Sequence, residues 1–124
     1  MTSAFLVLAC LMGAGGVVLA AAAAHGTPAS GLDSAAYLLL FHAIAVLGAA
    51  SLSRQELVRP PLALVAMACF VAGGALFAGD VAMRAFVGHR LFPMAAPTGG
   101  TLLIVGWLVL AAAAVVAMGA VHDR

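Results

Sequence analysis

The chain has 124 residues, of which 66% are hydrophobic and 7% are charged, and its formal net charge is +1. Soluble globular domains carry about 25% charged residues, so this composition predicts an integral membrane protein with a single domain. The sequence has no Lys and no basic patch with interleaved aromatic residues, which argues against a nucleic-acid partner.

Four apolar segments alternate with short polar ones, and a helix needs about 20 apolar residues to cross a bilayer. The expected fold is an all-α, polytopic four-helix transmembrane bundle that occupies residues 1–124 as one domain. Its helices are expected at about 4–24, 35–52, 62–84 and 98–119. The first segment lacks the basic start of a signal peptide, so we expect it to be a retained helix.

Residues that stop or start helical hydrogen bonding mark the helix ends. The Gly and Pro residues within 25–28 are expected to end the first helix, and Asp33 or Ser34 is expected to cap the second. Pro60 suits the start of the third helix, where a missing N–H costs nothing. The connection at 85–97 mixes apolar and basic residues, so we expect it to lie at the membrane interface.

Small residues recur at helical spacing and predict close helix packing, because lipid provides no hydrophobic drive between helices. Gly13, Gly16 and Gly73 are the expected packing positions in the first and third helices. In the fourth helix a seam of alternating small and large residues comprises Gly99, Leu103, Gly106, Leu110, Ala113 and Ala117.

Ionisable residues inside the apolar segments gather toward one end of the predicted bundle. His25 ends the first helix, His42 lies about two turns into the second, and Asp80 and Arg84 lie near the end of the third. We expect these four side chains to form a polar cluster in one leaflet. Small residues share the helix face of His42, so this face is expected to point into the bundle.

Asp80 and Arg84 are spaced i, i+4, so they are able to pair along one helix face. Charges within membranes are costly and often mark function. The pair is interpreted either as a structural ion pair or as a site for a proton, an ion or a partner.

His25 and His42 are candidate haem or metal ligands, since neutral imidazole suits both. The sequence shows no close cluster of His, Cys or carboxylate ligands, so neither a metal nor a cofactor is expected. Cys10 and Cys69 lie in apolar runs and are expected to pack as small hydrophobic residues.

The segment Pro97-Thr98-Gly99-Gly100 is similar to a turn that opens a helix, with Thr98 as the cap. Free N–H groups at a helix start bind anions, although this segment lacks the Lys and the spacing of a phosphate loop. Trp107 lies in mid-helix and is interpreted as a packing residue. The chain has no paired catalytic carboxylates and no nucleophile beside a base, so no enzyme activity is expected.

The distribution of Arg residues gives a topological signal. Arg54 and Arg59 in the second connection, together with Arg124, outnumber Arg84 and Arg90 on the opposite side. Because cytoplasmic loops carry the excess of basic residues, both termini are expected to be cytoplasmic.

Several short motifs occur in order along the chain: Ala24-His25-Gly26, Phe41-His42-Ala43, Leu76-Phe77-Ala78-Gly79, Ala96-Pro97-Thr98-Gly99-Gly100 and Gly106-Trp107. In these motifs the chain resembles the YgdD/YwdK-like family of small bacterial inner-membrane proteins, which has a mitochondrial relative in animals. The resemblance implies four transmembrane helices in the inner membrane and no established activity. In that family a small hydroxyl residue often follows the Gly79 position, where this chain has Asp80.

The sequence supports three hypotheses on function. The first is a non-enzymatic accessory or assembly subunit of a larger membrane complex, in contact with lipids and with other membrane-protein subunits or a second copy. The second is a small transporter or a proton-conducting or ion-conducting bundle that uses His42, Asp80 and Arg84. The third is a haem or metal protein that uses His25 and His42.

Overall fold

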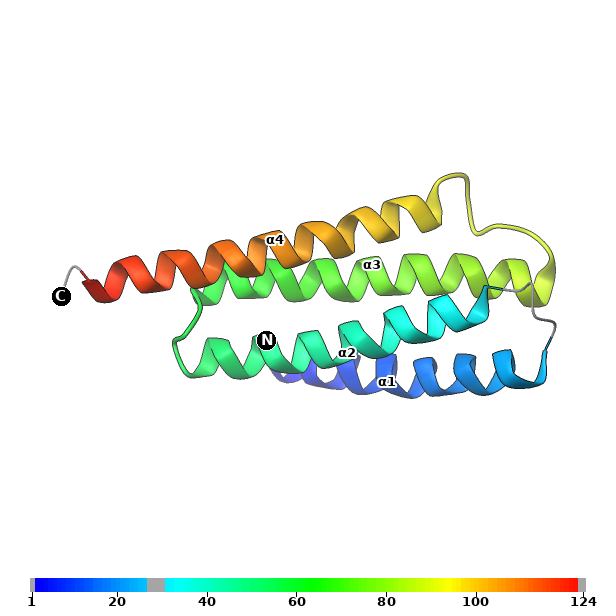
Figure 1. The fold of residues 1–124 in the computed structure, drawn as a ribbon, viewed down its shortest axis with the longest axis horizontal. Coiled ribbons are helices and arrows are strands. Elements are labelled where there is room, and N and C mark those ends of the chain that lie inside the picture. The colour runs from blue at the N-terminus through cyan, green and yellow to red at the C-terminus, as the bar shows by residue number, and fades with distance from the viewer. Residues whose placement is uncertain (1, 27–30, 123–124) are drawn as a thin grey trace.

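The computed structural model describes residues 2–26 and 31–122, and these residues form four helices (Figure 1). The helices are α1 (Thr2–His25), α2 (Leu32–Arg54), α3 (Pro60–Val87) and α4 (Ala95–His122). All four are long and apolar enough to cross a membrane, and no strand occurs in the described residues. The predicted all-α polytopic architecture is therefore confirmed.

Each helix extends past its expected bounds by a turn or less at each end. The N-cap of α2 is Gly31, with a φ of 69°, and this residue has no side chain with which to cap the helix. Asp33 and Ser34, the expected caps, lie inside the helix. The Asp33 carboxylate is in the first turn, where the positive end of the helix dipole stabilises it. Pro60 starts α3 as expected.

α4 also begins earlier than expected. Its first residue is Ala95, and Thr98 lies in the first turn, where its N–H bonds to the Met94 carbonyl at 2.9 Å. Thr98 is therefore not the cap, and the expected opening turn at 97–100 is helical. The stop signal expected at Pro28 and the terminal Arg124 lie outside the described residues.

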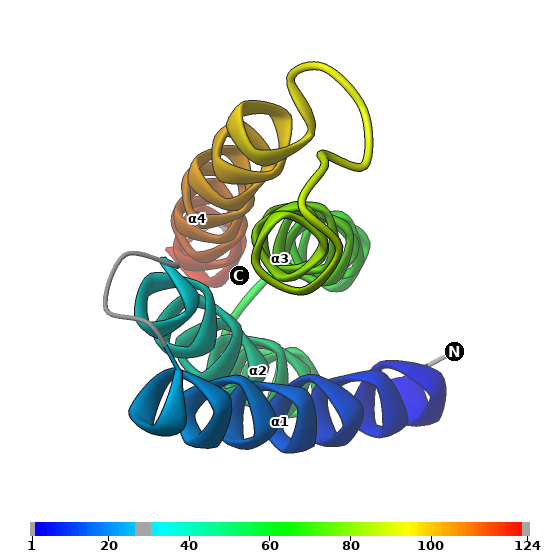
Figure 2. The same cartoon turned by 90° about the vertical axis from the view of Figure 1, so that its right-hand side faces the viewer.

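α3 is the central helix of the fold. It packs against both α2 and α4, whereas α1 packs mainly against α2. Figure 2 looks nearly along α3 and shows α1 lying across the view beneath α2, steeply inclined to α3. In Figure 1 the ends of α1 and α3 and the starts of α2 and α4 lie together at the right. The His25 end of α1 and the loop between α3 and α4 therefore lie at the same end of the bundle.

Glycines permit the closest approach between α3 and α4. A Cβ atom on Gly73 would lie 2.7 Å from the carbonyl oxygen of Gly99, and one on Gly99 would lie 2.6 Å from the backbone nitrogen of Phe77. A Cβ atom on Gly106 would lie 2.7 Å from the ring of Phe70. The whole expected seam of α4 is buried or half-buried.

Glycines of α1 differ in their surroundings. A Cβ atom on Gly16 would lie 2.6 Å from the side chain of Leu40, so Gly16 brings α1 close to α2. A Cβ atom on Gly13 would meet nothing within 4 Å. Gly13, which we expected to pack, is thus not a contact point between the described helices.

Candidate functional site

Three aromatic rings from three helices meet in the bundle. Trp107 of α4 donates a hydrogen bond from Nε1 to Nε2 of His42 on α2, at 3.1 Å. The ring of Phe70 on α3 lies against both, with centroid distances of 5.4 Å to His42 and 5.1 Å to Trp107. We call His42, Phe70 and Trp107 the ring cluster. It joins α2 to α4 across the central helix.

The hydrogen bonds assign the tautomer of His42. An indole N–H only donates and a carbonyl only accepts. His42 Nε2 must therefore accept from Trp107, while Nδ1 donates to the Leu38 carbonyl at 2.7 Å. These two bonds require the neutral imidazole with its proton on Nδ1. Each ring nitrogen then takes part in one hydrogen bond, and a proton on Nε2 would remove the lone pair that accepts the indole N–H.

The depth of His42 differs from the expectation. Because α2 begins at Leu32, His42 lies 10 residues into a helix of 23 residues. At 1.5 Å per residue this is about 15 Å, close to the middle of the helix. His42 is 6% exposed, so its face points into the bundle as expected. It lies further into the helix than the expected two turns.

Local sequence explains how the ring cluster assembles. Gly106 has no side chain, so the fully buried ring of Phe70 fits against the backbone of α4. The next residue, Trp107, then lies beside Phe70 and within reach of His42. On α2, small Ala35 is completely buried and permits close packing on the same side as His42.

Asp80 forms a second polar site on α3. Asp80 is 2% exposed, and each oxygen of its carboxylate has a partner. Oδ2 lies 3.2 Å from Nε of Arg84, and Oδ1 accepts the backbone N–H of Leu91 at 3.0 Å. A Cβ atom on Gly79 would lie 3.1 Å from Leu91 Cδ1, so the Leu91 side chain packs over this glycine. We call Asp80, Arg84 and Leu91 the loop anchor, because they hold the 88–94 loop on α3.

Helix length places the loop anchor relative to the membrane. α3 has 28 residues and is about 42 Å long, whereas the hydrocarbon core is about 30 Å thick. If the helix is centred, about four residues at each end extend past the core. Arg84 lies 3 residues before Val87, so in this arrangement it would lie at the headgroup level. Asp80 lies 7 residues before that end, about a turn inside the core.

A cavity of about 360 Å³ opens beside the loop anchor. We call it the arginine cavity, because Arg84 and Arg90 both line it. Asp80 also lines it, and the start of α4 provides Ala96, Pro97 and Gly100. Two basic residues and one acidic residue thus line the same opening.

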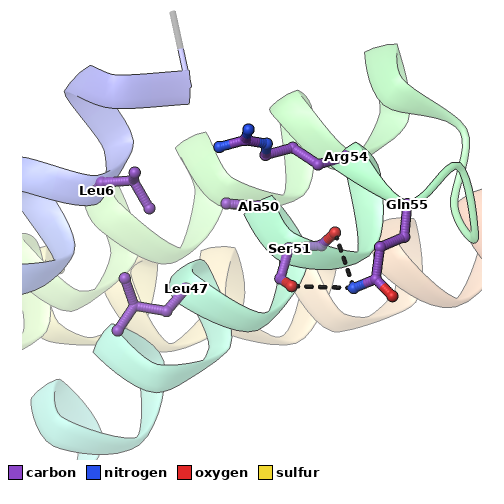
Figure 3. Close-up of a pocket in the computed structure, with 6 residues that line it drawn as sticks. All are labelled: Leu6, Leu47, Ala50, Ser51, Arg54 and Gln55. Atoms are coloured by element: carbon purple, nitrogen blue, oxygen red, sulfur yellow. Dashed lines mark hydrogen bonds between the residues drawn. The ribbon is translucent and has the colours of Figure 1, made fainter.

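A second cavity, of about 330 Å³, lies between α1 and α2 at the other end of the bundle (Figure 3). Its polar residues are Arg54, Ser51 and Gln55. Gln55 Nε2 donates to the hydroxyl of Ser51 at 3.1 Å. Figure 3 shows the Arg54 side chain extending past Ala50 toward α1. This cavity contains one charged group and no acid–base pair.

The expected polar cluster separates into distinct sites. His42 bonds to Trp107 on another helix, whereas Asp80 bonds to Arg84 and to the following loop. His25 is exposed at the end of α1. The structure brings Asp80, Arg84 and the 97–100 segment together around the arginine cavity. Sequence reasoning did not identify Arg90 as part of that site or Trp107 as the partner of His42.

The described residues offer little reactive chemistry. No group of three or more His, Cys, Asp or Glu residues among them is placed to hold a metal ion. Cys10 and Cys69 are both free thiols. Every buried side-chain nitrogen or oxygen in the described part of the chain has a hydrogen-bond partner. The buried polar groups of this part therefore form hydrogen bonds within the chain, between helices and between α3 and the 88–94 loop.

Comparison with known proteins identifies relatives of the chain. The family described as "Protein of unknown function (DUF423)" matches residues 19–100, a span that contains His42, Phe70 and Asp80. A "UPF0382 membrane protein" from Haemophilus influenzae is 32% identical over 118 residues, which cover 90% of this chain and 93% of the relative. No solved structure matches the chain. With four apolar helices and these matches over most of its length, the chain belongs to the DUF423 family and is a multi-pass membrane protein.

Proposed function

We propose that the protein is a non-enzymatic accessory or assembly subunit of a larger complex in the bacterial inner membrane, with both termini in the cytoplasm. The observation that best supports this proposal is the unequal burial of the helices. In their most apolar stretches, 44% of α2 and 39% of α3 residues are buried, against 17% in α1 and in α4. The two outer helices therefore offer most of their surface to lipid or to another membrane protein.

The polar groups support a structural role. Both nitrogens of His42 and both carboxylate oxygens of Asp80 are engaged within the chain. Such bonds fix the arrangement of helices, because unpaired polar groups are costly in hydrocarbon. We also propose that the chain is a YgdD/YwdK-like protein, and the short motifs that resemble this family support that assignment.

The two alternative functions receive less support. A transporter that used His42 with Asp80 and Arg84 would need a polar path between them. The arginine cavity is lined by the latter two residues and not by His42. A haem or metal on His42 would have to displace the Trp107 N–H from Nε2. His25, the second expected ligand, ends α1 at the surface.

Purification of the tagged protein from native membranes in a mild detergent tests the proposal. We expect a defined protein to co-purify in a constant ratio, identified by mass spectrometry, and a preparation without a visible haem spectrum. Isolation of the chain alone or only with copies of itself would contradict the subunit proposal. A haem absorption band lost in His42→Leu would instead favour the third hypothesis.

Site-specific photo-crosslinking adds a matched control on one helix. Leu108 of α4 is 65% exposed, whereas Leu103 on the same helix is 4% exposed. A photoreactive leucine analogue at 108 is expected to capture the co-purified protein, and the same analogue at 103 is expected to react within the chain. Equal capture from both positions would show that the crosslink does not report a surface of the folded protein.

A further inference from the structure

We propose that the arginine cavity binds the phosphate group of an anionic phospholipid at the end of the bundle that carries the loop between α3 and α4. The ligand chemistry is a phosphodiester with neighbouring glycerol oxygens, and its acyl chains would lie in the surrounding lipid. This binding site is independent of the subunit role proposed above.

The charges around the cavity favour an anion. Arg84 and Arg90 carry two positive charges against the single negative charge of Asp80, which leaves one net positive charge. Asp80 contacts Arg84 at Nε, so both terminal NH₂ groups of that guanidinium are available to bind an anion. The guanidinium of Arg90 has no hydrogen bond or ion pair within the described residues. Guanidinium groups match phosphate oxygens through paired hydrogen bonds.

The start of α4 adds one backbone N–H group, that of Ala96, beside the same opening. The N–H groups of Ala95 and Thr98 bond to carbonyls of the preceding loop, and Pro97 has no N–H. Ala96 lines the cavity, and its N–H has no loop carbonyl as partner. The positive end of the helix dipole therefore faces the region where the two arginines lie.

The position of the cavity selects a lipid over a soluble anion. With α3 centred in the bilayer, the charged wall at Arg84 lies at the headgroup level, and Phe77 provides an apolar wall on the side of the core. The neighbouring loop exposes Leu91, Phe92 and Met94, which suits contact with acyl chains near the interface. A volume of about 360 Å³ lies within the common range for small-ligand pockets, about 300–1,000 Å³.

Native mass spectrometry of the detergent-solubilised full chain tests the proposal. The protein is titrated with dioleoyl-phosphatidylglycerol and, separately, with dioleoyl-phosphatidylcholine. The wild-type protein is expected to bind phosphatidylglycerol more tightly than phosphatidylcholine. Arg84→Gln combined with Arg90→Gln is expected to weaken that binding about thirtyfold and to leave binding of the zwitterionic lipid unchanged. The matched control is Arg54→Gln, because Arg54 borders the other cavity and lacks a second arginine.

A variant that is expected to raise the affinity for phosphatidylglycerol tests the proposal even if the double variant folds poorly. Asp80→Asn removes the negative charge while its amide oxygen still accepts the Leu91 N–H, so affinity for phosphatidylglycerol is expected to rise several-fold. Equal binding of the two lipids by wild type, or equal loss in Arg54→Gln, would overturn the proposal. Displacement of the lipid by millimolar inorganic phosphate at constant ionic strength would also overturn it, in favour of a soluble phosphate site.

Discussion

The hydrogen bond between Trp107 and His42 is expected to stabilise the association of α4 with the rest of the bundle. Trp107→Phe keeps an aromatic ring against Phe70 but removes the indole N–H that donates to His42 Nε2 at 3.1 Å. His42 is 6% exposed, and lipid offers no replacement donor. The perturbation therefore leaves an unpaired acceptor inside the bundle.

The expected coupling free energy between Trp107 and His42 follows from their burial and from measured energies of hydrogen bonds in membranes. Interhelical hydrogen bonds in membranes contribute about 0.6 kcal/mol on average and about 1.7 kcal/mol at most. His42 is deeply buried, whereas Trp107 is half exposed, so we expect a coupling of about 1 kcal/mol. That value corresponds to about a fivefold change in the unfolding equilibrium.

A double-mutant cycle measures the coupling. The variants are Trp107→Phe, His42→Leu and their combination, unfolded by sodium dodecyl sulfate from dodecyl maltoside micelles. Circular dichroism is the readout, because Trp107 is the single tryptophan and its fluorescence is lost in two variants. Effects that add within about 0.3 kcal/mol would refute the argument, since independent residues show no coupling.

Two further predictions concern helix packing and the loop. Gly99→Ala is expected to destabilise the fold by about 1–3 kcal/mol in the same unfolding assay, because its Cβ would lie 2.6 Å from a backbone nitrogen of α3. Gly13→Ala, the control in open space, should be neutral or stabilising, and equal losses would refute the packing argument. Asp80→Ala is expected to accelerate tryptic cleavage after Arg90 about fivefold, because the Leu91 N–H loses a bond of about 1 kcal/mol. Asp80→Asn keeps an acceptor and should be cut at nearly the wild-type rate, so matching rates in the two variants would contradict the loop anchor.

The sequence was sufficient for features that depend on local pattern. Apolar length predicted the four helices, and the i, i+4 spacing of Asp80 and Arg84 predicted their ion pair. The small residues beside His42 predicted that its side chain is buried. These features need only the geometry of a single helix, which the sequence specifies.

Features that depend on two chain segments were not predictable. The bond from Leu91 to Asp80 requires the chain to reverse at Gly88, whose φ is 84°. The depth of His42 was underestimated because Asp33 looked like a cap, whereas the left-handed Gly31 starts α2 earlier. The two arginines of the cavity come together only after the loop folds back onto α3.

The fit of Phe70 against Gly106 ties together positions that are far apart along the chain. A relative with a side chain at the Gly106 position would need a smaller residue at the Phe70 position, or its fourth helix would move outward. Outward movement would separate the indole from the imidazole, and a polar residue at the His42 position would then lose its partner. Substitutions at these positions should therefore be correlated across the family, with the glycine as the residue that restricts the other two.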